Sequence, residues 1–391
     1  MIKIIDLGMH PFADTFISND HLKLSEPVYP LQCFMDSNTG LIKLGCDTVA
    51  DERYNLYDYS YTSSNSNFSR NHWVEYCENV IDRIGIDNCS KVLEIGSNDG
   101  FLSKQFIDKG CNVFGVDSSA AMSNLAKENG VTTYNMIFDL DSSHDLKNNI
   151  GSCDLIIANN VFNHANDPVN FAMGVSNLLK DRGCFVFELP YWLNTIVDKR
   201  FDQIYHEHVT YFTAKYAHWL LSQCGLVISD IEVVDYHGGS LRVFARKLND
   251  VSYVNISAKE LIEREEALGL FNPETYKSFM KELHLRRNNF LKNIYELKAN
   301  GKSIVCVGAA AKGNTLLNFY NLDHTVIDYV TDSSEHKQGK YTPLTRIPIV
   351  GDEIFAEYEE VYALILSWNI SDNLKANLTK INKNIKFLSL T

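Results

Sequence analysis

Four side chains that can take up or release protons stand together in the segment Phe201–His208. The segment reads Phe-Asp-Gln-Ile-Tyr-His-Glu-His, which places consecutively Tyr205, His206, Glu207 and His208. Histidine titrates near neutral pH, so it can accept and return protons under cellular conditions. Polar clusters of this kind usually lie on loops that a rigid scaffold holds in place. The pattern indicates acid–base chemistry, and a hydrogen-bonded surface turn is the alternative.

A glycine-rich turn lies between an expected strand, Lys91–Ile95, and an expected helix that starts at Phe101. The turn reads Glu-Ile-Gly-Ser-Asn-Asp-Gly over residues 94–100. Glycine lets the backbone turn sharply and approach a ligand closely. The spacing Gly-x-x-x-Gly differs from the Gly-x-Gly-x-x-Gly of dinucleotide sites, in which a pyrophosphate meets a helix N-terminus. An adenosine group without phosphates suits this turn better than a dinucleotide.

Acidic residues around the turn indicate the kind of cofactor. Asp117 follows the next expected strand, Asn112–Val116, and can accept hydrogen bonds from both hydroxyls of a ribose. Such charge-assisted hydrogen bonds are worth roughly 1.5–3 kcal/mol each. Glu94 and Asp99 add negative charge, which suits a sulfonium cation and would repel a pyrophosphate. Together the strand, the turn, the helix and the acid resemble the class I S-adenosylmethionine-dependent methyltransferases.

This resemblance implies an S-adenosylmethionine site at the carboxyl ends of parallel strands. Asn159 and Asn160 end a later expected strand, Leu155–Ala158, and would line the same crevice, with His164 on the adjoining loop. The implied cofactor contacts are Glu94, Gly96, Asn98, Gly100, Asp117 and Asn159.

The apolar runs predict an α/β protein, in which the resemblance implies a class I methyltransferase Rossmann-like domain. Residues 81–256 alternate short apolar runs with amphipathic segments, which predicts a parallel sheet with helices on both faces. Residues 1–80 are irregular and aromatic-rich and form a small N-terminal lobe. Residues 257–300 form one or two connecting helices, interrupted near Asn272-Pro273.

Residues 301–391 predict a second, C-terminal Rossmann-like domain. Ser303–Val307 is an expected strand, Gly308–Asn314 a turn of small residues, and Thr315 opens a helix. Two further strands are expected at Val326–Val330 and Tyr362–Leu366. Two open sheets, each with its own glycine turn, predict two ligand-binding crevices.

Composition restricts the function classes. The 391 residues are 45% hydrophobic and 22% charged, as in a soluble globular protein. The formal net charge of −13 argues against broad nucleic-acid binding, which needs a basic surface. No apolar run is long enough to cross a bilayer, so no membrane partner is expected. The nine cysteines lack paired spacing, which indicates reduced residues of a cytoplasmic protein.

Motifs along nearly the whole chain resemble one narrower family, the sugar C-methyltransferases that act on nucleotide-linked ketosugars. Besides the glycine turn and Gln203–His208, they include segments starting at Asp6, Pro11, Gly40, Tyr61, His237, Gly308, Lys337 and Ser367. The resemblance implies methylation of a carbon beside the ketone of a nucleotide-linked 4-keto-6-deoxysugar, with carbon 3 as the methylated position. It also implies that the C-terminal domain grips the sugar nucleotide.

The resemblance assigns roles to single residues. His208 is the expected general base, and Tyr205 and Glu207 orient it or handle the ketone oxygen. Tyr61 matches a tyrosine that closes over the active site, and His206 has a supporting role. The expected substrate contacts are His164, His237, Gly238, Arg242, Lys312, Asn314 and Thr315. Of these, Lys312 and the backbone N–H groups around it would meet the pyrophosphate at a helix N-terminus.

One departure from the family concerns a metal. Family members usually carry two Cys-x-x-Cys pairs that hold a structural zinc in the N-terminal lobe. Here the first pair is missing, and the second pair reads Asp36 and Thr39. Zinc prefers four thiolate or imidazole ligands, and Cys33 and Cys46 do not restore that spacing. We therefore expect no zinc, and a lobe held by apolar contacts among Leu22, Leu24, Tyr29, Leu31, Phe34, Leu41 and Leu44.

Other readings remain open. An O- or N-methyltransferase acting on a sugar or small metabolite would use the same scaffold and would need little more than positioning. A nicotinamide-dependent dehydrogenase is disfavoured by the missing Gly-x-Gly-x-x-Gly. A non-catalytic sugar-nucleotide binding protein would not need the proton-handling cluster. The identity of the sugar and of its nucleotide is not readable from these residues, and a monomer is expected.

Overall fold

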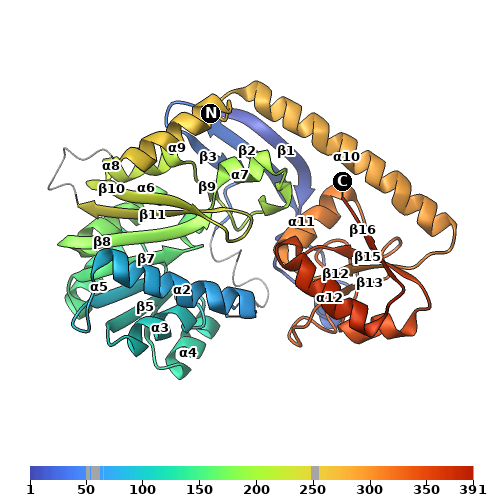
Figure 1. Ribbon diagram of the computed structural model, residues 1–391, viewed down its shortest axis with the longest axis horizontal. Coiled ribbons are helices and arrows are strands. Elements are labelled where there is room, and N and C mark those ends of the chain that lie inside the picture. The colour runs from blue at the N-terminus through green and yellow to red at the C-terminus, as the bar shows by residue number, and fades with distance from the viewer. Residues whose placement is uncertain (50–52, 54–61, 65, 248–254, 391) are drawn as a thin grey trace.

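The computed structural model describes residues 1–49, 53, 62–64, 66–247 and 255–390. A seven-stranded sheet forms the centre of its larger lobe (Figure 1). Its strands are β4 (Lys91–Ile95), β5 (Asn112–Asp117), β6 (Thr132–Asn135), β7 (Cys153–Asn159), β8 (Leu179–Pro190), β10 (Leu226–Val234) and β11 (Ser240–Lys247). Their order is β10-β11-β8-β7-β4-β5-β6. The five strands β4, β5, β6, β7 and β8 run parallel to one another, and β11 is antiparallel to both of its neighbours. The strand order reverses between β4 and β7, where open α/β sheets bind ligands beyond the carboxyl ends of the strands.

The central strands are buried on both faces, because apolar residues fill both sides of the pleat. Val92 and Ile157 pack toward one face, whereas Leu93 and Ile156 pack toward the other. Helices α2 (Asn67–Ile84) and α3 (Phe101–Asp108) cover the first face, α4 (Ala120–Glu128) packs on β5 and β6, and α5 (Leu140–Ile150), α6 (Pro168–Leu178) and α8 (Ala214–Gln223) cover the second. The predicted parallel sheet with helices on both faces is confirmed.

The N-terminal segment is more regular than the sequence predicted. Strands β1 (Ile2–His10), β2 (Tyr29–Asp36), β3 (Leu41–Leu44) and β9 (Thr210–Tyr211) form an antiparallel sheet in the order β1-β2-β3-β9. In β2 the buried side chains of Leu31, Cys33 and Met35 alternate with partly exposed ones, which is the period of a half-buried strand. The predicted irregular lobe is therefore wrong. Leu31 and Leu44 belong to its core as expected, but Leu24 is exposed.

Asp36 and Thr39 close the turn between β2 and β3 by hydrogen bonds. The Asp36 carboxylate accepts the Asn38 N–H at 3.0 Å and the Thr39 hydroxyl at 3.1 Å, and the Gly40 N–H donates to the Asp36 carbonyl at 2.9 Å. These donors and acceptors do not form the thiolate set that zinc prefers, so the residues do not fit a zinc site. We expect elemental analysis of the purified protein to find no stoichiometric zinc. One zinc per chain would contradict this prediction.

The smaller lobe contains a second, five-stranded parallel sheet. Its strands are β12 (Ile304–Val307), β13 (Tyr329–Thr331), β14 (Ile349–Val350), β15 (Val361–Ile365) and β16 (Ile385–Leu388), in the order β14-β13-β12-β15-β16. Helix α11 (Ala311–Tyr320) follows β12, and α12 (Ser371–Ile381) precedes β16. Helix α11 begins at Ala311, four residues before the predicted Thr315, and therefore includes Gly313. A Cβ on Gly313 would lie 2.8 Å from the Leu366 side chain. The strand expected from Val326 starts only at Tyr329.

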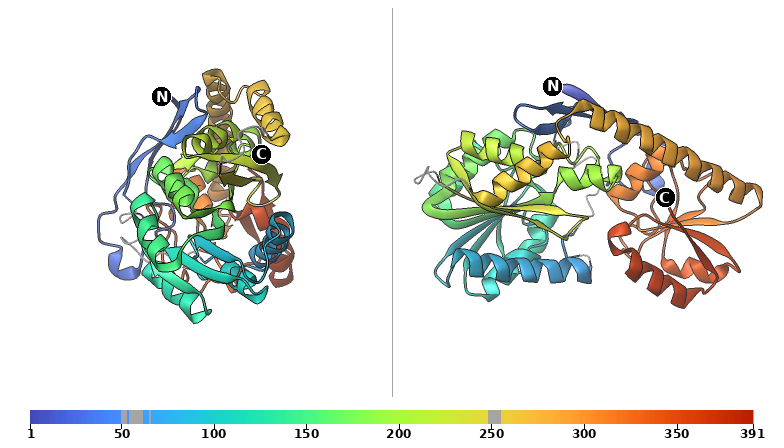
Figure 2. Two further views of the ribbon diagram at one scale, coloured as in Figure 1. Left: turned by 90° about the vertical axis from the view of Figure 1, so that its left-hand side faces the viewer. Right: turned by 45° about the horizontal axis from the view of Figure 1, so that its top comes forward.

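Helices α9 (Ile256–Ala267) and α10 (Pro273–Ala299) connect the two lobes, as predicted, with the interruption at Asn272-Pro273. Figure 2 shows α10 running along the top of the molecule from the larger lobe to the smaller one. The buried Glu265 of α9 accepts hydrogen bonds from the Tyr191 hydroxyl and from the Ala214 and Lys215 N–H groups at the start of α8. No helix in the described part of the chain is long and apolar enough to cross a membrane.

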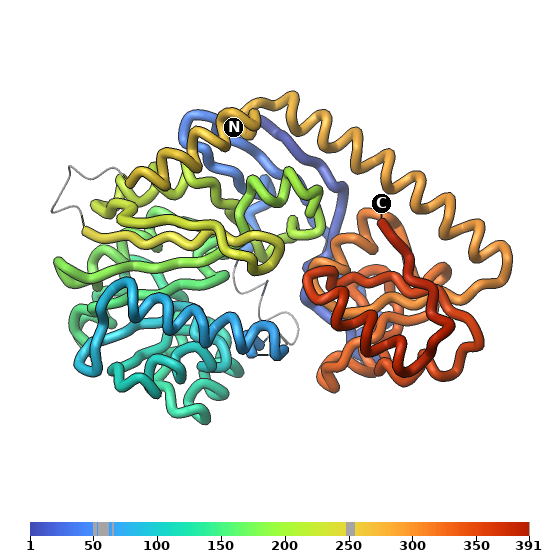
Figure 3. The backbone as a smooth tube through the Cα atoms, viewed as in Figure 1, coloured from blue at the N-terminus to red at the C-terminus, as the bar shows by residue number. Residues whose placement is uncertain are grey.

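The N-terminal chain also reaches the smaller lobe. Figure 3 shows the blue chain leaving β1 beside the larger lobe and passing to the side of the red lobe. There Ile17 exchanges two backbone hydrogen bonds with Tyr341, at 2.8 and 2.9 Å.

The remaining short elements are α7 (Trp192–Val197) and the 3₁₀ turns η1 (Asn19–His21), η2 (Phe162–His164), η3 (Phe201–Gln203), η4 (Asp352–Glu357) and η5 (Trp368–Ile370).

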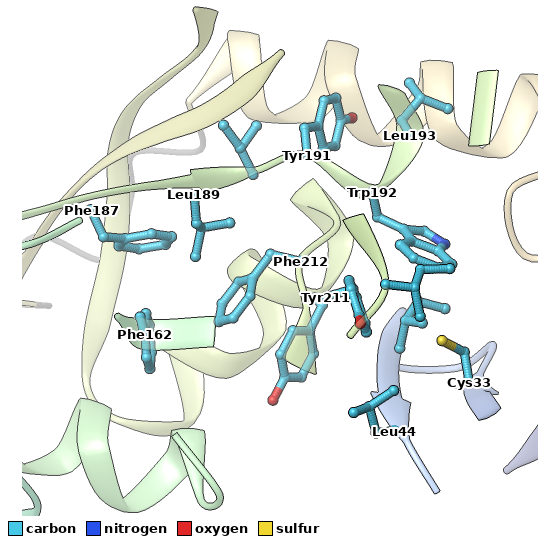
Figure 4. Close-up of a cluster of buried hydrophobic side chains, with 14 of the residues drawn as sticks. Cys33, Leu44, Phe162, Phe187, Leu189, Tyr191, Trp192, Leu193, Tyr211 and Phe212 are labelled. Atoms are coloured by element: carbon cyan, nitrogen blue, oxygen red, sulfur yellow. The ribbon is translucent and has the colours of Figure 1, made fainter. Parts of the chain in front are cut away.

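A continuous aromatic core holds the segment that follows the proton-handling cluster. Phe212 packs against Phe162 and Phe187, with ring centroids 5.0 and 5.8 Å away, and Tyr211 packs against Trp192 at 4.8 Å (Figure 4). The Leu44 N–H of β3 also donates to the Val209 carbonyl at 2.9 Å. The cluster is thus attached to a rigid core immediately after its last residue, His208.

Candidate active site

The glycine turn and Asp117 form one hydrogen-bonded unit at the carboxyl ends of β4 and β5. The Gly96 N–H donates to the Val116 carbonyl at 2.7 Å, and a Cβ on Gly96 would lie 2.8 Å from Val161. One oxygen of the Asp117 carboxylate accepts the Asn98 N–H at 2.8 Å, and the other accepts the Ser119 N–H at 2.8 Å. Each oxygen keeps a lone pair for a ribose hydroxyl.

A cavity of about 160 Å³ opens at this unit, at the switch point of the sheet. Its walls include Gly96, Asn98, Asp117, Asn159, Asn160 and His164. The Asn159 carboxamide is buried and makes no hydrogen bond of normal geometry within the described part of the chain, although the Tyr76 hydroxyl lies beside it. Buried polar atoms of this kind need a partner, so the walls fit the ribose and polar groups of S-adenosylmethionine.

The carboxylates of Glu94 and Asp99, which were expected to add negative charge here, accept hydrogen bonds from serine hydroxyls of the protein. Glu94 is buried behind the turn and accepts the Ser103 hydroxyl at 2.5 Å, and burial raises its pKa to about 8. It is therefore mostly neutral at pH 7. Asp99 accepts hydrogen bonds from the hydroxyls of Ser63, a wall residue of the cavity, and Ser64. Gly100 begins α3 with φ of 78° and shapes the turn.

A second cavity, of about 220 Å³, adjoins the first. The two share Asn160 and His164 as wall residues. All three parts of the chain line it: Asp14 from the N-terminal segment, Tyr205, Glu207, His208 and His237 from the larger lobe, and Ala310, Ala311, Lys312, Lys337, Ser367 and Asn369 from the smaller lobe.

Tyr205 and His208 form a hydrogen-bonded pair in this cavity. The Tyr205 hydroxyl lies 2.8 Å from Nε2 of His208, and Nδ1 of His208 lies 3.1 Å from the Gln203 carbonyl. A carbonyl only accepts, so Nδ1 carries the proton and Nε2 is left with its lone pair. Burial lowers the pKa of His208 to about 3, and the nearby Lys312 acts in the same direction. His208 is therefore a neutral imidazole that can accept a proton at Nε2.

Glu207 is a buried carboxyl group with one oxygen left over. Its Oε1 accepts the Asp14 N–H at 3.1 Å, whereas Oε2 has no hydrogen-bond partner among residues 1–49, 53, 62–64, 66–247 and 255–390. Burial raises the pKa of Glu207 to about 7, and the carboxylate of Asp14 adds to the shift. Near neutral pH the group exists in both forms, and its protonated form can donate a hydrogen bond into the cavity.

The two halves of the chain match family models in the same order as the two lobes. Residues 70–230 match a model described as a methyltransferase domain, and residues 235–389 match one described as a C-methyltransferase C-terminal domain. The strand order with its crevice at the switch point agrees with the first match. The chain is an S-adenosylmethionine-dependent C-methyltransferase.

Individual relatives of this C-methyltransferase are distant. C-methyltransferase NovU of Streptomyces niveus is 28% identical over 376 residues, which cover 96% of this chain and 89% of the relative. Magnesium protoporphyrin IX methyltransferase from Synechocystis PCC 6803, solved with bound SAM, is 16% identical, with a TM-score of 0.36 over 48% of this chain and 87% of its own. A methyltransferase from Clostridium acetobutylicum is 14% identical, with a TM-score of 0.36 over 47% and 93%. At these TM-scores the two structures add nothing to the topology.

Four predicted substrate residues of the C-methyltransferase line the second cavity or border it. His164 stands where the two cavities meet, with its ring centroid 5.2 Å from that of His208. The Lys312 ammonium lies 3.4 Å from Nδ1 of His237. Burial lowers the pKa of Lys312 to about 8, so the ammonium form prevails at pH 7. Gly238 lies beside the Trp368 ring, which a Cβ would meet at 2.7 Å.

Three other predicted substrate residues make contacts within the protein instead. Arg242 is a buried residue of β11, and its Nη2 lies 2.7 Å from the carboxylate of Glu188. The Asn314 carboxamide donates to the Ala13 carbonyl at 2.6 Å, and the Thr315 hydroxyl donates to the Ile204 carbonyl at 3.3 Å. Because α11 starts at Ala311, both residues lie one turn beyond its N-terminus and hold the lobes together.

His206 and Tyr61 complete the predicted set. His206 is fully buried against Phe12 and Tyr29, with ring centroids 5.9 and 5.8 Å away, so it faces the N-terminal segment and not the cavity. This position agrees with a supporting role only. Tyr61 lies outside the described residues.

Sequence reasoning missed two contributors to the second cavity's surroundings. Arg200 stacks on the Trp368 ring at 3.5 Å, and the Trp368 indole N–H donates to Asp202 at 2.5 Å. A third missed residue, Arg53, lines the first cavity and donates to the His164 carbonyl at 3.1 Å. The segment starting at Ser367 was among the recognised motifs and could have drawn attention to Trp368.

Proposed function

We propose that this C-methyltransferase transfers a methyl group to a carbon beside the ketone of a nucleotide-linked 4-keto-6-deoxysugar, with carbon 3 as the expected position. The observation that carries the proposal is the meeting of the two cavities at Asn160 and His164. One cavity fits the methyl donor, and the other holds a neutral base on one wall and a helix N-terminus with a lysine on the opposite wall. A ketosugar fits the first wall, and its diphosphate fits the second.

The smaller lobe supports a nucleotide as part of the substrate, because it repeats the hydrogen bonds around Asp117. The Gly308 N–H donates to the Thr331 carbonyl at 2.7 Å. One Asp332 oxygen accepts the Ala309 N–H at 2.8 Å, and the other accepts the Ser334 N–H at 2.9 Å. A carboxylate fixed in this way can accept a sugar hydroxyl of the nucleotide. The first turn of α11 has no side-chain cap, which leaves its N–H groups for the diphosphate.

The residues around the second cavity can carry out enolisation. When bound, S-adenosylmethionine supplies an electrophilic methyl group on a sulfonium. Nε2 of His208 takes the proton from the carbon beside the ketone, and the C–H electron pair moves into the enolate. The Tyr205 hydroxyl, which occupies Nε2 in this structure, then donates to the enolate oxygen together with protonated Glu207. With S-adenosylmethionine bound, the enolate carbon would form the new C–C bond as the methyl–sulfur bond breaks and leaves its electron pair on sulfur, and His208 afterwards releases its proton to solvent.

A panel assay tests this function. The protein is incubated with S-adenosylmethionine and 4-keto-6-deoxysugars linked to different nucleotides, and the products are examined by mass and by carbon NMR. We expect one added methyl group, bonded to the carbon beside the ketone. A methyl group on oxygen or nitrogen would instead identify a heteroatom methyltransferase and contradict the proposal.

Glu207 should give the reaction a characteristic dependence on pH. Its pKa of about 7 means that the donating, protonated form is lost as the pH rises through 7. We therefore expect kcat, measured with saturating sugar nucleotide so that loss of the Lys312 charge near pH 8 does not enter, to fall with increasing pH above this value. Glu207→Gln keeps a donor at every pH and should remove this decline. A decline of the same size in Glu207→Gln would show that another group is responsible.

Lys312 should contribute to binding of the sugar nucleotide only. Lys312→Ala removes the ammonium at the N-terminus of α11, and a charged hydrogen bond is worth roughly 1.5–3 kcal/mol, or about a 10- to 100-fold change in Kd. Calorimetry should show this loss of affinity for the sugar nucleotide and no change of affinity for S-adenosylmethionine. Lys104→Ala, an exposed lysine on α3, is the matched control. Equal losses for both ligands would contradict the separation of the two sites.

A further inference from the structure

Gln203 makes three hydrogen bonds that converge on the second cavity. The residue is buried at the end of η3, and its backbone carbonyl accepts the Nδ1 proton of His208 at 3.1 Å. Its side-chain Oε1 accepts the Thr195 hydroxyl of α7 at 3.1 Å. Its side-chain Nε2 donates to the His237 carbonyl at 2.6 Å. One residue therefore contacts the expected base, the larger lobe's helix α7 and the turn before β11.

The first of these bonds decides which nitrogen of His208 carries the proton. A neutral imidazole has one N–H and one lone pair, and the group that Nδ1 meets sets the tautomer. With the Gln203 carbonyl at Nδ1, the lone pair remains on Nε2, which faces the Tyr205 hydroxyl at 2.8 Å. If this peptide group turned away, the proton could move to Nε2, and His208 could no longer accept one there.

The two side-chain bonds fix the orientation of that peptide group. The Gln203 carboxamide is held at both ends, by Thr195 on its oxygen and by His237 on its nitrogen. His237 has a φ of 52°, in the left-handed region, within a turn completed by Gly238 and Gly239. The same His237 approaches Lys312 across the cavity. Gln203 thus connects the position of the base with the turn that meets the smaller lobe.

We propose that Gln203 is a positioning residue that keeps His208 in the tautomer with its lone pair on Nε2 and fixes the position of His208 relative to His237. The proposal rests on the proposed function, because it takes His208 as the base. It makes a statement about the tautomer that can be tested without turnover.

Variants of Gln203 and Thr195, together with a spectroscopic readout on His208, test the proposal. In wild-type protein with ¹⁵N-labelled histidine, long-range ¹⁵N–¹H spectra should show His208 protonated at Nδ1, with the signal assigned by its absence in His208→Asn. Gln203→Ala should disturb this signal and slow deuterium exchange beside the ketone about 10- to 100-fold, as expected for a misplaced catalytic group. The affinity for S-adenosylmethionine, measured by calorimetry, should stay unchanged because Gln203 is remote from the first cavity.

Thr195 provides a milder pair in case Gln203→Ala fails to fold. Thr195→Val keeps the shape of the side chain but removes the hydroxyl that donates to Gln203 Oε1. We expect kcat to fall and the KM for S-adenosylmethionine to stay unchanged. Thr195→Ser keeps the hydroxyl and should recover most of that loss.

Several outcomes would overturn the proposal. Wild-type His208 protonated at Nε2 would do so directly, as would a Gln203→Ala variant with an unaltered His208 signal and full exchange. Equal kcat values for Thr195→Val and Thr195→Ser would also contradict it. Full deuterium exchange in His208→Asn is different, because it would refute the base of the proposed function while the tautomer readout still decides the role of Gln203.

Discussion

His208→Asn is expected to lower methyl transfer about 10²- to 10⁴-fold, which is the usual contribution of a general base. Asparagine keeps a donor near the Gln203 carbonyl but has no basic nitrogen facing Tyr205. In the wild-type protein Nε2 of His208 carries a lone pair, and burial keeps the pKa of His208 at about 3. The base should therefore remain active well below the usual histidine range.

The control for this variant is His218→Asn. His218 lies on an exposed position of α8, so the same substitution there should leave kcat unchanged. Calorimetry should show normal binding of S-adenosylmethionine to both variants. A loss of less than 10-fold in His208→Asn would mean that the methyl acceptor needs positioning only, as a hydroxyl or an amine does.

Asp117→Ala should nearly abolish binding of the methyl donor. The variant removes the carboxylate that we expect to accept two hydrogen bonds from the ribose hydroxyls, worth roughly 1.5–3 kcal/mol each, which corresponds to about a 10²- to 10⁴-fold increase in Kd. It also releases the N–H groups of Asn98 and Ser119, so the glycine turn loses its support. Calorimetry with S-adenosylhomocysteine measures the effect without turnover.

Two further variants make this result specific. Asp117→Asn keeps the shape and loses the charge, so its Kd should lie between those of the wild type and Asp117→Ala. Asp145→Ala changes an exposed aspartate on α5 and should not alter Kd. Unchanged binding in Asp117→Ala would show that the donor does not use the crevice at β4 and β5. The sugar-nucleotide affinity should hold in all three variants.

The sequence predicted the larger sheet well, because its strands are continuous apolar runs with a clear turn after each. Lys91–Ile95 and Asn112–Asp117 fall where the pattern placed them, and Gly96 and Asp117 meet at one crevice. The part of this crevice at β4 and β5 depends on local features: a glycine in the turn and an acid at the end of the next strand. Such features are visible in one sequence.

Features that depend on distant contacts were not predictable in the same way. The sheet of the N-terminal segment needs β9, which comes from residues 210–211, and a two-residue strand carries no pattern of its own. Arg242 follows two glycines and looked like a ligand residue, but its partner Glu188 is 54 positions away. Asn314 and Thr315 were placed at a helix N-terminus because the small residues before them resembled a loop.

Proton removal from the carbon beside a ketone is the step on which the proposed C-methylation depends. It is tested most directly in deuterated water, with a nucleotide-linked 4-keto-6-deoxysugar and S-adenosylhomocysteine, which is expected to occupy the first cavity and cannot donate a methyl group. We predict that wild-type protein introduces deuterium beside the ketone and that His208→Asn does not. Absence of exchange in wild-type protein that nevertheless methylates an oxygen or nitrogen of the same sugar would contradict the account.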